Sequence, residues 1–219
     1  MNLFTYERVH IKMRNLTKKK KQERRQRIFS NAVYLLKKKG FTNTSMLDIA
    51  EKSNLAVGTL YNYYPSKNDL IIAIFNRENQ KFLRKINNKL KNLLQSDKNA
   101  RSIILEVVLQ FFNDLIFLSK KNMREIMTAL FSSEDYLQKG MEEDLRLISL
   151  IEQCLENLKT KNKIKKNIDT NLTAEIIYGI VFEQFIMYCM IPELKKRELR
   201  KRLHQQIKIL FYGIKPETG

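Results

Sequence analysis

Apolar residues recur at intervals of three and four along most of the chain, the spacing that places them on one face of an α-helix. No run of alternating apolar and polar residues with strand character stands out, so we predict an all-α fold. The predicted helices span about 21–39, 45–53, 56–63, 66–94, 99–120, 122–133, 140–159, 172–191 and 193–213. Only six glycines and three prolines occur, and most fall at the predicted boundaries.

The second predicted helix begins with a capping box. Ser45 can accept a hydrogen bond from a backbone N–H three residues on, and Asp48 can reach back to the Ser45 N–H. Met46, Ile49 and Ala50 then share one face, and the small Ala50 allows another helix to approach closely. We therefore expect this face to be buried.

A tight turn separates this helix from the next. Asn54 lies where the chain must turn, and asparagine tolerates the left-handed conformation that such a turn requires. In the short helix Ala56–Tyr63, Leu60 and Tyr64 are spaced to point inward. Gly58 costs about 1 kcal/mol relative to alanine in a helix. Close approach of another molecule to the backbone would explain it.

Together these motifs resemble the N-terminal DNA-binding domain of the TetR family of bacterial transcriptional regulators. The resemblance covers about residues 24–75 and rests on Gly40-Phe41, Thr44-Ser45, Asp48-Ile49-Ala50, Gly58-Thr59-Leu60-Tyr61, Tyr63-Tyr64, Pro65-Ser66-Lys67 and Leu70. Two positions depart from the family pattern. Asn54 replaces the usual glycine, and Ala56 replaces a serine that commonly caps the recognition helix.

The resemblance implies a homodimer with an N-terminal three-helix helix-turn-helix domain and a C-terminal helical domain for ligand binding and dimerisation. We accordingly divide the chain into a basic, flexible arm (1–20), a DNA-binding domain (21–66) and an effector-binding and dimerisation domain (67–219). The expected partners are a double-stranded DNA operator, a second copy of the chain and a small hydrophobic effector. Repression is favoured over activation, because blocking a promoter requires no additional contacts.

Residues at the recognition helix are assigned to two roles. For base edges we expect Thr59 and Asn62, with Val57 facing a thymine methyl group and Gly58 permitting close approach. By resemblance, the phosphate contacts fall to further residues. These are Ser45, Tyr61, Tyr63 and Lys67, with Ala56 at the start of the helix. Packing within the protein is the alternative for both tyrosines.

Charge supports this assignment. The net charge is +18, and residues 12–40 contain twelve lysines and arginines against one acid. The basic run Lys18–Lys21, with the arginines that follow it, would supply the attraction to phosphate either as a solvated tail or as an arm along the DNA. A sequence-nonspecific basic DNA-binding protein is therefore an alternative function, and a helical partner-binding protein is another.

The C-terminal part contains aromatic and methionine side chains that could belong either to the core or to a ligand cavity. The candidate effector residues are Phe111, Phe112, Met127, Phe131 and Phe182. Glu106, Glu125 or Glu183 would select a cation if one of them faced inward.

The helix 172–191 is apolar nearly all round, but Glu175, Glu183 and Gln184 interrupt it, so we expect a subunit interface and no membrane span. The expected contacts are Tyr178, Gly179, Phe182, Phe185 and Ile186.

Catalytic chemistry finds little support. His10 and His204 are the only histidines, and no metal-ligand spacing, phosphate loop or nucleophile motif accompanies them. We therefore expect no enzyme activity, no metal and no cofactor. The N-terminus lacks the apolar core of a signal peptide, which predicts a cytoplasmic protein. Cys154 and Cys189 lie on apolar helices, and we interpret them as small buried hydrophobic residues.

Overall fold

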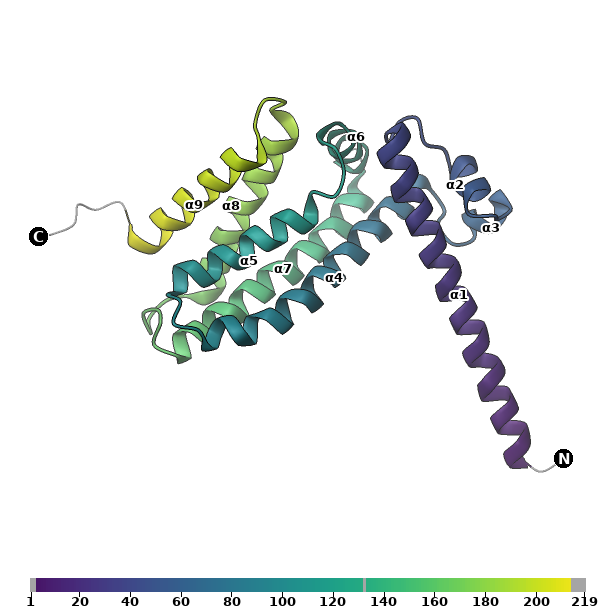
Figure 1. Ribbon diagram of the computed structural model, residues 1–219, viewed down its shortest axis with the longest axis horizontal. Helices are drawn as coiled ribbons and strands as arrows, with labels where there is room; N and C mark the ends of the chain where they lie inside the picture. The colour runs from purple at the N-terminus through teal and green to yellow at the C-terminus, as the bar shows by residue number, and fades with distance from the viewer. Residues whose placement is uncertain (1–2, 132, 214–219) are drawn as a thin grey trace, which may run out of the picture. The chain divides into compact units, whose positions relative to one another are not determined.

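The computed structural model describes residues 3–131 and 133–213, and all regular secondary structure in these ranges is helical (Figure 1). The all-α prediction is thereby confirmed. The helices are α1 (Leu3–Lys39), α2 (Met46–Lys52), α3 (Val57–Tyr61), α4 (Lys67–Gln95), α5 (Ala100–Leu115), α6 (Lys120–Phe131), α7 (Glu134–Thr160), α8 (Thr170–Met190) and α9 (Lys196–Tyr212). The chain forms two compact units, Met1–Leu70 and Ile71–Gly219, and their boundary lies inside α4.

Helix α1 begins at Leu3, well before Lys21, where we expected it to start. No glycine or proline precedes Gly40, so the backbone contains nothing that would stop a helix earlier. Gly40 then follows the helix with a left-handed φ of 87°. Residues 3–20 are thus continuous with α1, and their role as an arm on DNA stays a prediction.

The first unit is held together by a small apolar core. Ile28, Ala32 and Leu36 of α1 are buried with Ile49 of α2 and Leu60 of α3. Ala50 is fully buried as well, as its position on the apolar face of α2 predicted. The core leaves the opposite face of α3 in solvent, which is the face predicted to meet DNA.

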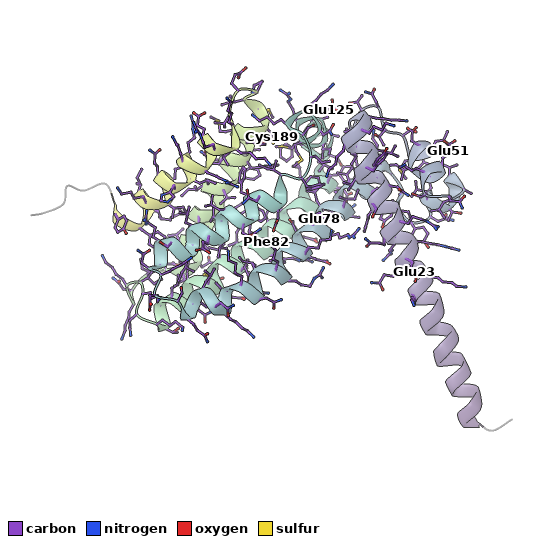
Figure 2. The ribbon with its side chains drawn as sticks, in the orientation of Figure 1. Glu23, Glu51, Glu78, Phe82, Glu125 and Cys189 are labelled. Atoms are coloured by element: carbon purple, nitrogen blue, oxygen red, sulfur yellow. The ribbon has the colours of Figure 1, made fainter. Side chains whose placement is uncertain are left out.

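The second unit is a helical bundle in which α7 packs along α8, and α9 packs against both α8 and α5. Its largest fully buried side chains include Ile103, Ile104, Met123 and Ile151. Both cysteines are buried here, which confirms their expected position (Cys189 is labelled in Figure 2). Burial raises the pKa of Cys154 to about 12 and that of Cys189 to about 11.

Helix α7 begins at Glu134, earlier than the predicted start near residue 140. The prediction treated Gly140 as a boundary, whereas the helix passes through it, and a Cβ atom there would meet nothing within 4 Å. Ser133 precedes the helix, and Glu134 and Asp135 place negative charge in its first turn, where the helix dipole favours it. Acidic residues after a serine were the better signal for this helix start.

Helix α8 is long and apolar enough, by length and composition alone, to cross a membrane. Within the bundle, however, α6, α7 and α9 pack against it and bury Ala174, Ile177 and Val181. A helix buried in the core of a helical bundle has the same composition. We therefore interpret α8 as the central packing helix of the second unit.

Candidate nucleic-acid interface and ligand cavity

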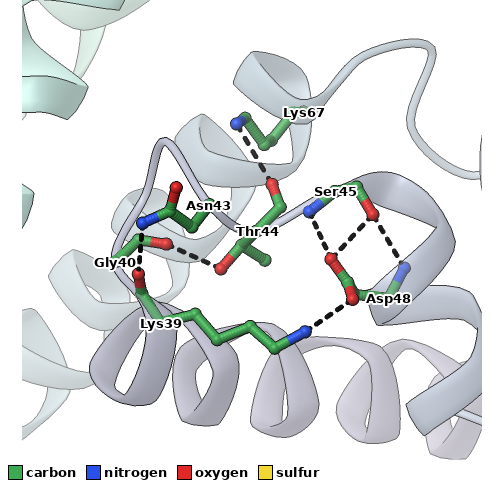
Figure 3. Close-up of polar contacts among 7 residues, drawn as sticks. All are labelled: Lys39, Gly40, Asn43, Thr44, Ser45, Asp48 and Lys67. Carbon is green, nitrogen blue, oxygen red and sulfur yellow. Dashed lines mark hydrogen bonds and ion pairs between the residues drawn. The ribbon is translucent and has the colours of Figure 1, made fainter.

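A capping box fixes the start of α2 (Figure 3). The Asp48 N–H donates to Ser45 Oγ at 3.0 Å, and the Ser45 N–H donates to Asp48 Oδ2 at 2.8 Å, as predicted. Lys39 Nζ adds an ion pair with Asp48 Oδ1 at 2.7 Å. Hydrogen bonds from Lys39 and then Ser45 hold the pKa of Asp48 well below its ordinary value. This stabilisation is present above the ordinary pKa and is lost as the pH falls through the lowered one.

The turn between α2 and α3 has the predicted left-handed residue. Asn54 has a φ of 52°, and the Leu55 N–H donates to the Ala50 carbonyl at 3.0 Å. Asn31 of α1 fixes the same turn, because its Nδ2 donates to the Lys52 carbonyl at 3.0 Å. The angle between the two helices is therefore set by backbone bonds and by one side chain from α1.

Helix α3 presents a small and polar surface. Leu60 and Tyr64 are buried, as their spacing predicted. The remaining candidates for DNA contact lie on the other side. Ala56, Val57, Gly58, Tyr61 and Asn62 are exposed, and Thr59 and Tyr63 are half-buried. Ala56 is the N-cap residue of α3 and provides no side-chain hydrogen bond to the helix N-terminus. This is expected, because alanine replaces a serine that could accept such a bond.

Gly58 has no neighbour inside the protein that would explain it. A Cβ atom built on this residue meets nothing within 4 Å. The backbone is helical there, so the left-handed conformation is not the reason either. The remaining physical reason for a glycine is an external surface that approaches the backbone closely.

Lys67, whose predicted phosphate contact stays a prediction, makes contacts inside the protein (Figure 3). Its Nζ donates to the carbonyl oxygens of Phe41 at 3.0 Å and Thr44 at 3.1 Å, and it lies 4.1 Å from the centre of the Phe41 ring. Thr44 itself is buried and donates to the Gly40 carbonyl at 2.7 Å. Lys67 thus joins the first turn of α4 to the loop between α1 and α2.

A basic groove of about 480 Å³ lies beside the C-terminal end of α3. It is lined by Lys20, Lys21, Arg24 and Arg25 of α1 together with Asn62 and Tyr63. All four basic side chains are exposed. The sequence showed the basic run, but only the fold shows that part of it lies next to the predicted recognition helix.

The second unit contains a cavity of about 170 Å³ between α4, α5, α6, α7 and α8. Phe111, Met127, Phe131 and Phe182 line it, as predicted. Phe112 does not, because it is buried in the core with its ring edge-on to Phe185 and Tyr188. The other lining residues are Ile72, Phe75, Asn76, Asn79, Met123, Ile126, Leu130, Tyr136, Gly140, Asp144, Tyr178, Val181 and Phe185.

None of the three glutamates proposed to face a ligand lines this cavity. Glu106 forms ion pairs with Lys89 and Lys98. Glu125 pairs with Lys121 on α6 (Figure 2), and Glu183 accepts hydrogen bonds from Gln184 and Gln206. The acid in the cavity is Asp144 of α7, whose carboxylate is hydrogen-bonded to the Tyr178 hydroxyl. The helical spacing did not reveal which acid faced inward.

The predicted interface residues separate into two groups. Gly179 is exposed and Ile186 is half-buried, so a second subunit could reach them, and Phe182 is exposed but also lines the cavity. Tyr178 and Phe185 line the cavity, and Phe185 is also buried against Phe112. The cavity wall and the expected interface therefore share helix α8.

The geometry of α2, its turn and α3 defines a helix-turn-helix DNA-binding domain. Residues 28–74 match the family model for bacterial regulatory proteins of the tetR family. The N-terminal domain of the chain is therefore of the tetR-family type, which identifies the chain as a DNA-binding transcriptional regulator.

Several regulators are similar to the chain. It is 20% identical to the fatty acid metabolism regulator protein of Bacillus subtilis over 198 residues, which cover 90% of this chain and 98% of that protein. It is 39% identical to the repressor KstR of Rhodococcus jostii over 64 residues, or 29% of this chain and 30% of that protein.

The fold is similar to solved structures of FadR. The Thermus thermophilus protein in complex with lauroyl-CoA has a TM-score of 0.68 at 20% identity, covering 89% of this chain and 99% of that chain. The Bacillus subtilis protein in complex with stearoyl-CoA has a TM-score of 0.62 at 20% identity. The alignment covers 87% of this chain and 99% of that chain.

Replacing Lys67 by methionine should lower the free energy of unfolding by about 1–3 kcal/mol, because the Phe41 and Thr44 carbonyls lose their donor. Chemical denaturation measures this. Lys52→Met is the matched control, since the Lys52 ammonium lies over the Tyr34 ring on the surface, and its loss should change stability by less than about 0.5 kcal/mol. Equal effects of the two substitutions would contradict the structural role of Lys67.

Replacing Gly58 by alanine should weaken DNA binding without destabilising the protein. The new methyl group meets nothing inside the chain, and alanine favours the helix by up to about 1 kcal/mol. Gly140→Ala is the control, because it adds the same methyl group in an equally open position on α7. Melting temperature and operator affinity are measured for both, and unchanged affinity of the Gly58 variant would remove the case for close approach.

Proposed function

We propose that the protein is a repressor that binds a near-palindromic operator as a homodimer and is released when a small, mainly apolar effector occupies the cavity. The main support for this proposal is that helix α4 contributes residues both to the DNA-binding unit and to the cavity. Its first turn, through Lys67 and the buried Leu70, belongs to the DNA-binding unit, and Ile72, Phe75 and Asn76 of the same helix line the cavity.

Sequence recognition falls to the exposed face of α3. Val57, Thr59 and Asn62 offer a methyl surface, a hydroxyl and an amide, which are groups that read base edges in the major groove. The basic groove beside them supplies phosphate contacts, with Tyr63 on its wall. Ser45 and Tyr61 remain in the proposal as phosphate ligands at the edge of this surface.

Dimerisation is assigned to α8. Leu172, Ile176 and Met190 are 54%, 45% and 46% exposed, so three large apolar side chains of this helix contact water. Together with Gly179 and Ile186 they follow intervals of three, four and seven, and so they share one face of the helix. A second copy of the same face would cover them, and it would place two recognition helices in successive major grooves about 34–36 Å apart.

An apolar effector is supported by the lining of the cavity, in which hydrophobic and aromatic side chains predominate. Two proteins of similar fold have been solved in complex with acyl-CoA molecules, so this fold has a precedent for a ligand with an apolar chain. Filling the cavity would favour a position of α4 that differs from the DNA-competent one, and the population would shift accordingly. Such a regulator acts in the cytoplasm, where bacterial DNA lies.

The net charge of +18 also supports a second candidate function, sequence-nonspecific binding to DNA. The two functions are separated by selecting genomic fragments with the purified protein in the presence of excess nonspecific DNA. The repressor proposal expects a recurring inverted repeat. Retention of all fragments with equal affinity would favour the nonspecific alternative.

Replacing Lys21 or Arg24 by glutamine should reduce the dependence of operator affinity on salt, because each lost phosphate contact lowers the logarithmic slope by about 0.9, counted in both subunits of a dimer. The preferred sequence should not change. Lys38→Gln is the matched control, since Lys38 is an exposed residue of α1 that does not line the basic groove. If the control and the groove variants give the same slope, the groove is not the phosphate site.

Replacing Asn62 by alanine should relax the preference at particular operator positions, at a cost of about 1–3 kcal/mol for the cognate base pair. Thr59→Val should act at neighbouring positions. Selection from random duplexes with each variant measures this. Uniform weakening at all positions would show that these side chains do not contact base edges.

A further inference from the structure

The cavity contains one charged group. Asp144 is the only ionisable acid or base other than tyrosine among the described residues that line it, and neither lysine nor arginine appears in that part of the wall. We propose that the effector is a lipophilic organic cation, with its positive charge on Asp144 and its apolar body among the aromatic side chains. This inference rests on the proposed function, because it names the ligand class of the same cavity.

Asp144 is built into the wall from two helices. It lies on α7 and is hydrogen-bonded to the hydroxyl of Tyr178 on α8, which also lines the cavity. A carboxylate can accept about four hydrogen bonds, so one hydroxyl leaves most of its capacity for a ligand. Burial raises the pKa of Asp144. A cation placed beside it would restore the charged form, and binding and ionisation would therefore support each other.

The rest of the wall suits a cation with an apolar body. Seven aromatic rings line the cavity, contributed by Phe75, Phe111, Phe131, Tyr136, Tyr178, Phe182 and Phe185. The faces of aromatic rings attract cations, most strongly where water is excluded. The rings of Tyr178 and Phe182 are stacked, with centroids 5.9 Å apart, and Tyr178 is hydrogen-bonded to the carboxylate. Asn76 and Asn79 of α4 add neutral polar groups.

The same wall disfavours anions. A carboxylate or phosphate ligand would meet Asp144 without a basic side chain from the described lining to offset the repulsion. The acyl chain of an acyl-CoA would satisfy the apolar residues but would give Asp144 no partner of opposite charge. A neutral aromatic molecule would likewise leave the carboxylate in a site partly removed from water. The negative charge of Asp144 therefore favours cationic over anionic and neutral ligands, even where these have the same shape.

The test uses two probes of the same shape and different charge. Phenyltrimethylammonium is a permanent cation, and tert-butylbenzene is its neutral isostere. Calorimetric titration of the full-length protein with each probe, and with lauroyl-CoA as an acyl-CoA, gives the affinities. Operator release by each probe is then followed by fluorescence anisotropy of labelled DNA. We expect the cation to bind at least about tenfold more tightly than its isostere, and to release the operator.

Three variants test whether Asp144 causes the tighter binding of the cation. Asp144→Asn keeps the size and a hydrogen-bond acceptor but removes the charge, and it should lower cation affinity about tenfold while leaving the isostere unchanged. Tyr178→Phe should lower the ratio of cation affinity to isostere affinity less than Asp144→Asn does, since the carboxylate remains. Glu142→Gln is the matched control, because it removes one acid from an exposed position on the same helix. Circular dichroism shows whether each variant is folded.

The outcomes separate this inference from the proposed function. Equal binding of cation and isostere, with both releasing DNA, would overturn the cation proposal and leave the effector cavity in place. Tight binding of lauroyl-CoA that Asp144→Asn leaves unchanged would assign the cavity to an acyl chain. Failure of every probe to bind would count against the cavity itself. A loss in Glu142→Gln equal to that in Asp144→Asn would show that only net charge matters.

Discussion

The Lys67 ammonium group donates to the carbonyl oxygens of Phe41 and Thr44, and by doing so it ties the start of α4 to the loop that precedes α2. That loop continues directly into Ser45 and the capping box that sets where α2 begins. A displacement of α4 must either carry this loop with it or break two hydrogen bonds. Because the donor is charged and the acceptors are close, carrying the loop costs less. The first turn of α4 is thereby hydrogen-bonded to the loop that leads into the helix-turn-helix.

The DNA-binding part was largely predictable because its signals are local. A capping box, a left-handed asparagine and two inward side chains depend on neighbours within a few residues, and all are present. The role of Lys67 was not predictable, since its carbonyl partners lie more than twenty residues away in sequence. Phe112 was wrongly assigned to the cavity and Asp144 was overlooked for a related reason. An apolar helix has core and cavity faces of the same composition, and only packing tells which is which.

The lining of the cavity, and not the fold, is the basis on which we propose a ligand class. FadR proteins with the same architecture hold acyl-CoA molecules at about one-fifth identity, so their topology alone says little about which molecule is bound here. The deciding groups are few. In our proposal one carboxylate and a set of rings determine the sign of the charge that the wall accepts, and a single substitution at Asp144 would alter it. Ligand identity is therefore carried by side chains that the fold does not constrain.

The apolar face of α8 has a consequence for the amount of protein in the cell. Leu172, Ile176 and Met190 are largely exposed on a single chain, and water contact with such a row is unfavourable. If a second copy covers them, folding and association are linked by mass action, and the fold becomes less stable as the protein is diluted. A cell that makes less of this chain would then lose both operator occupancy and the lifetime of each remaining molecule.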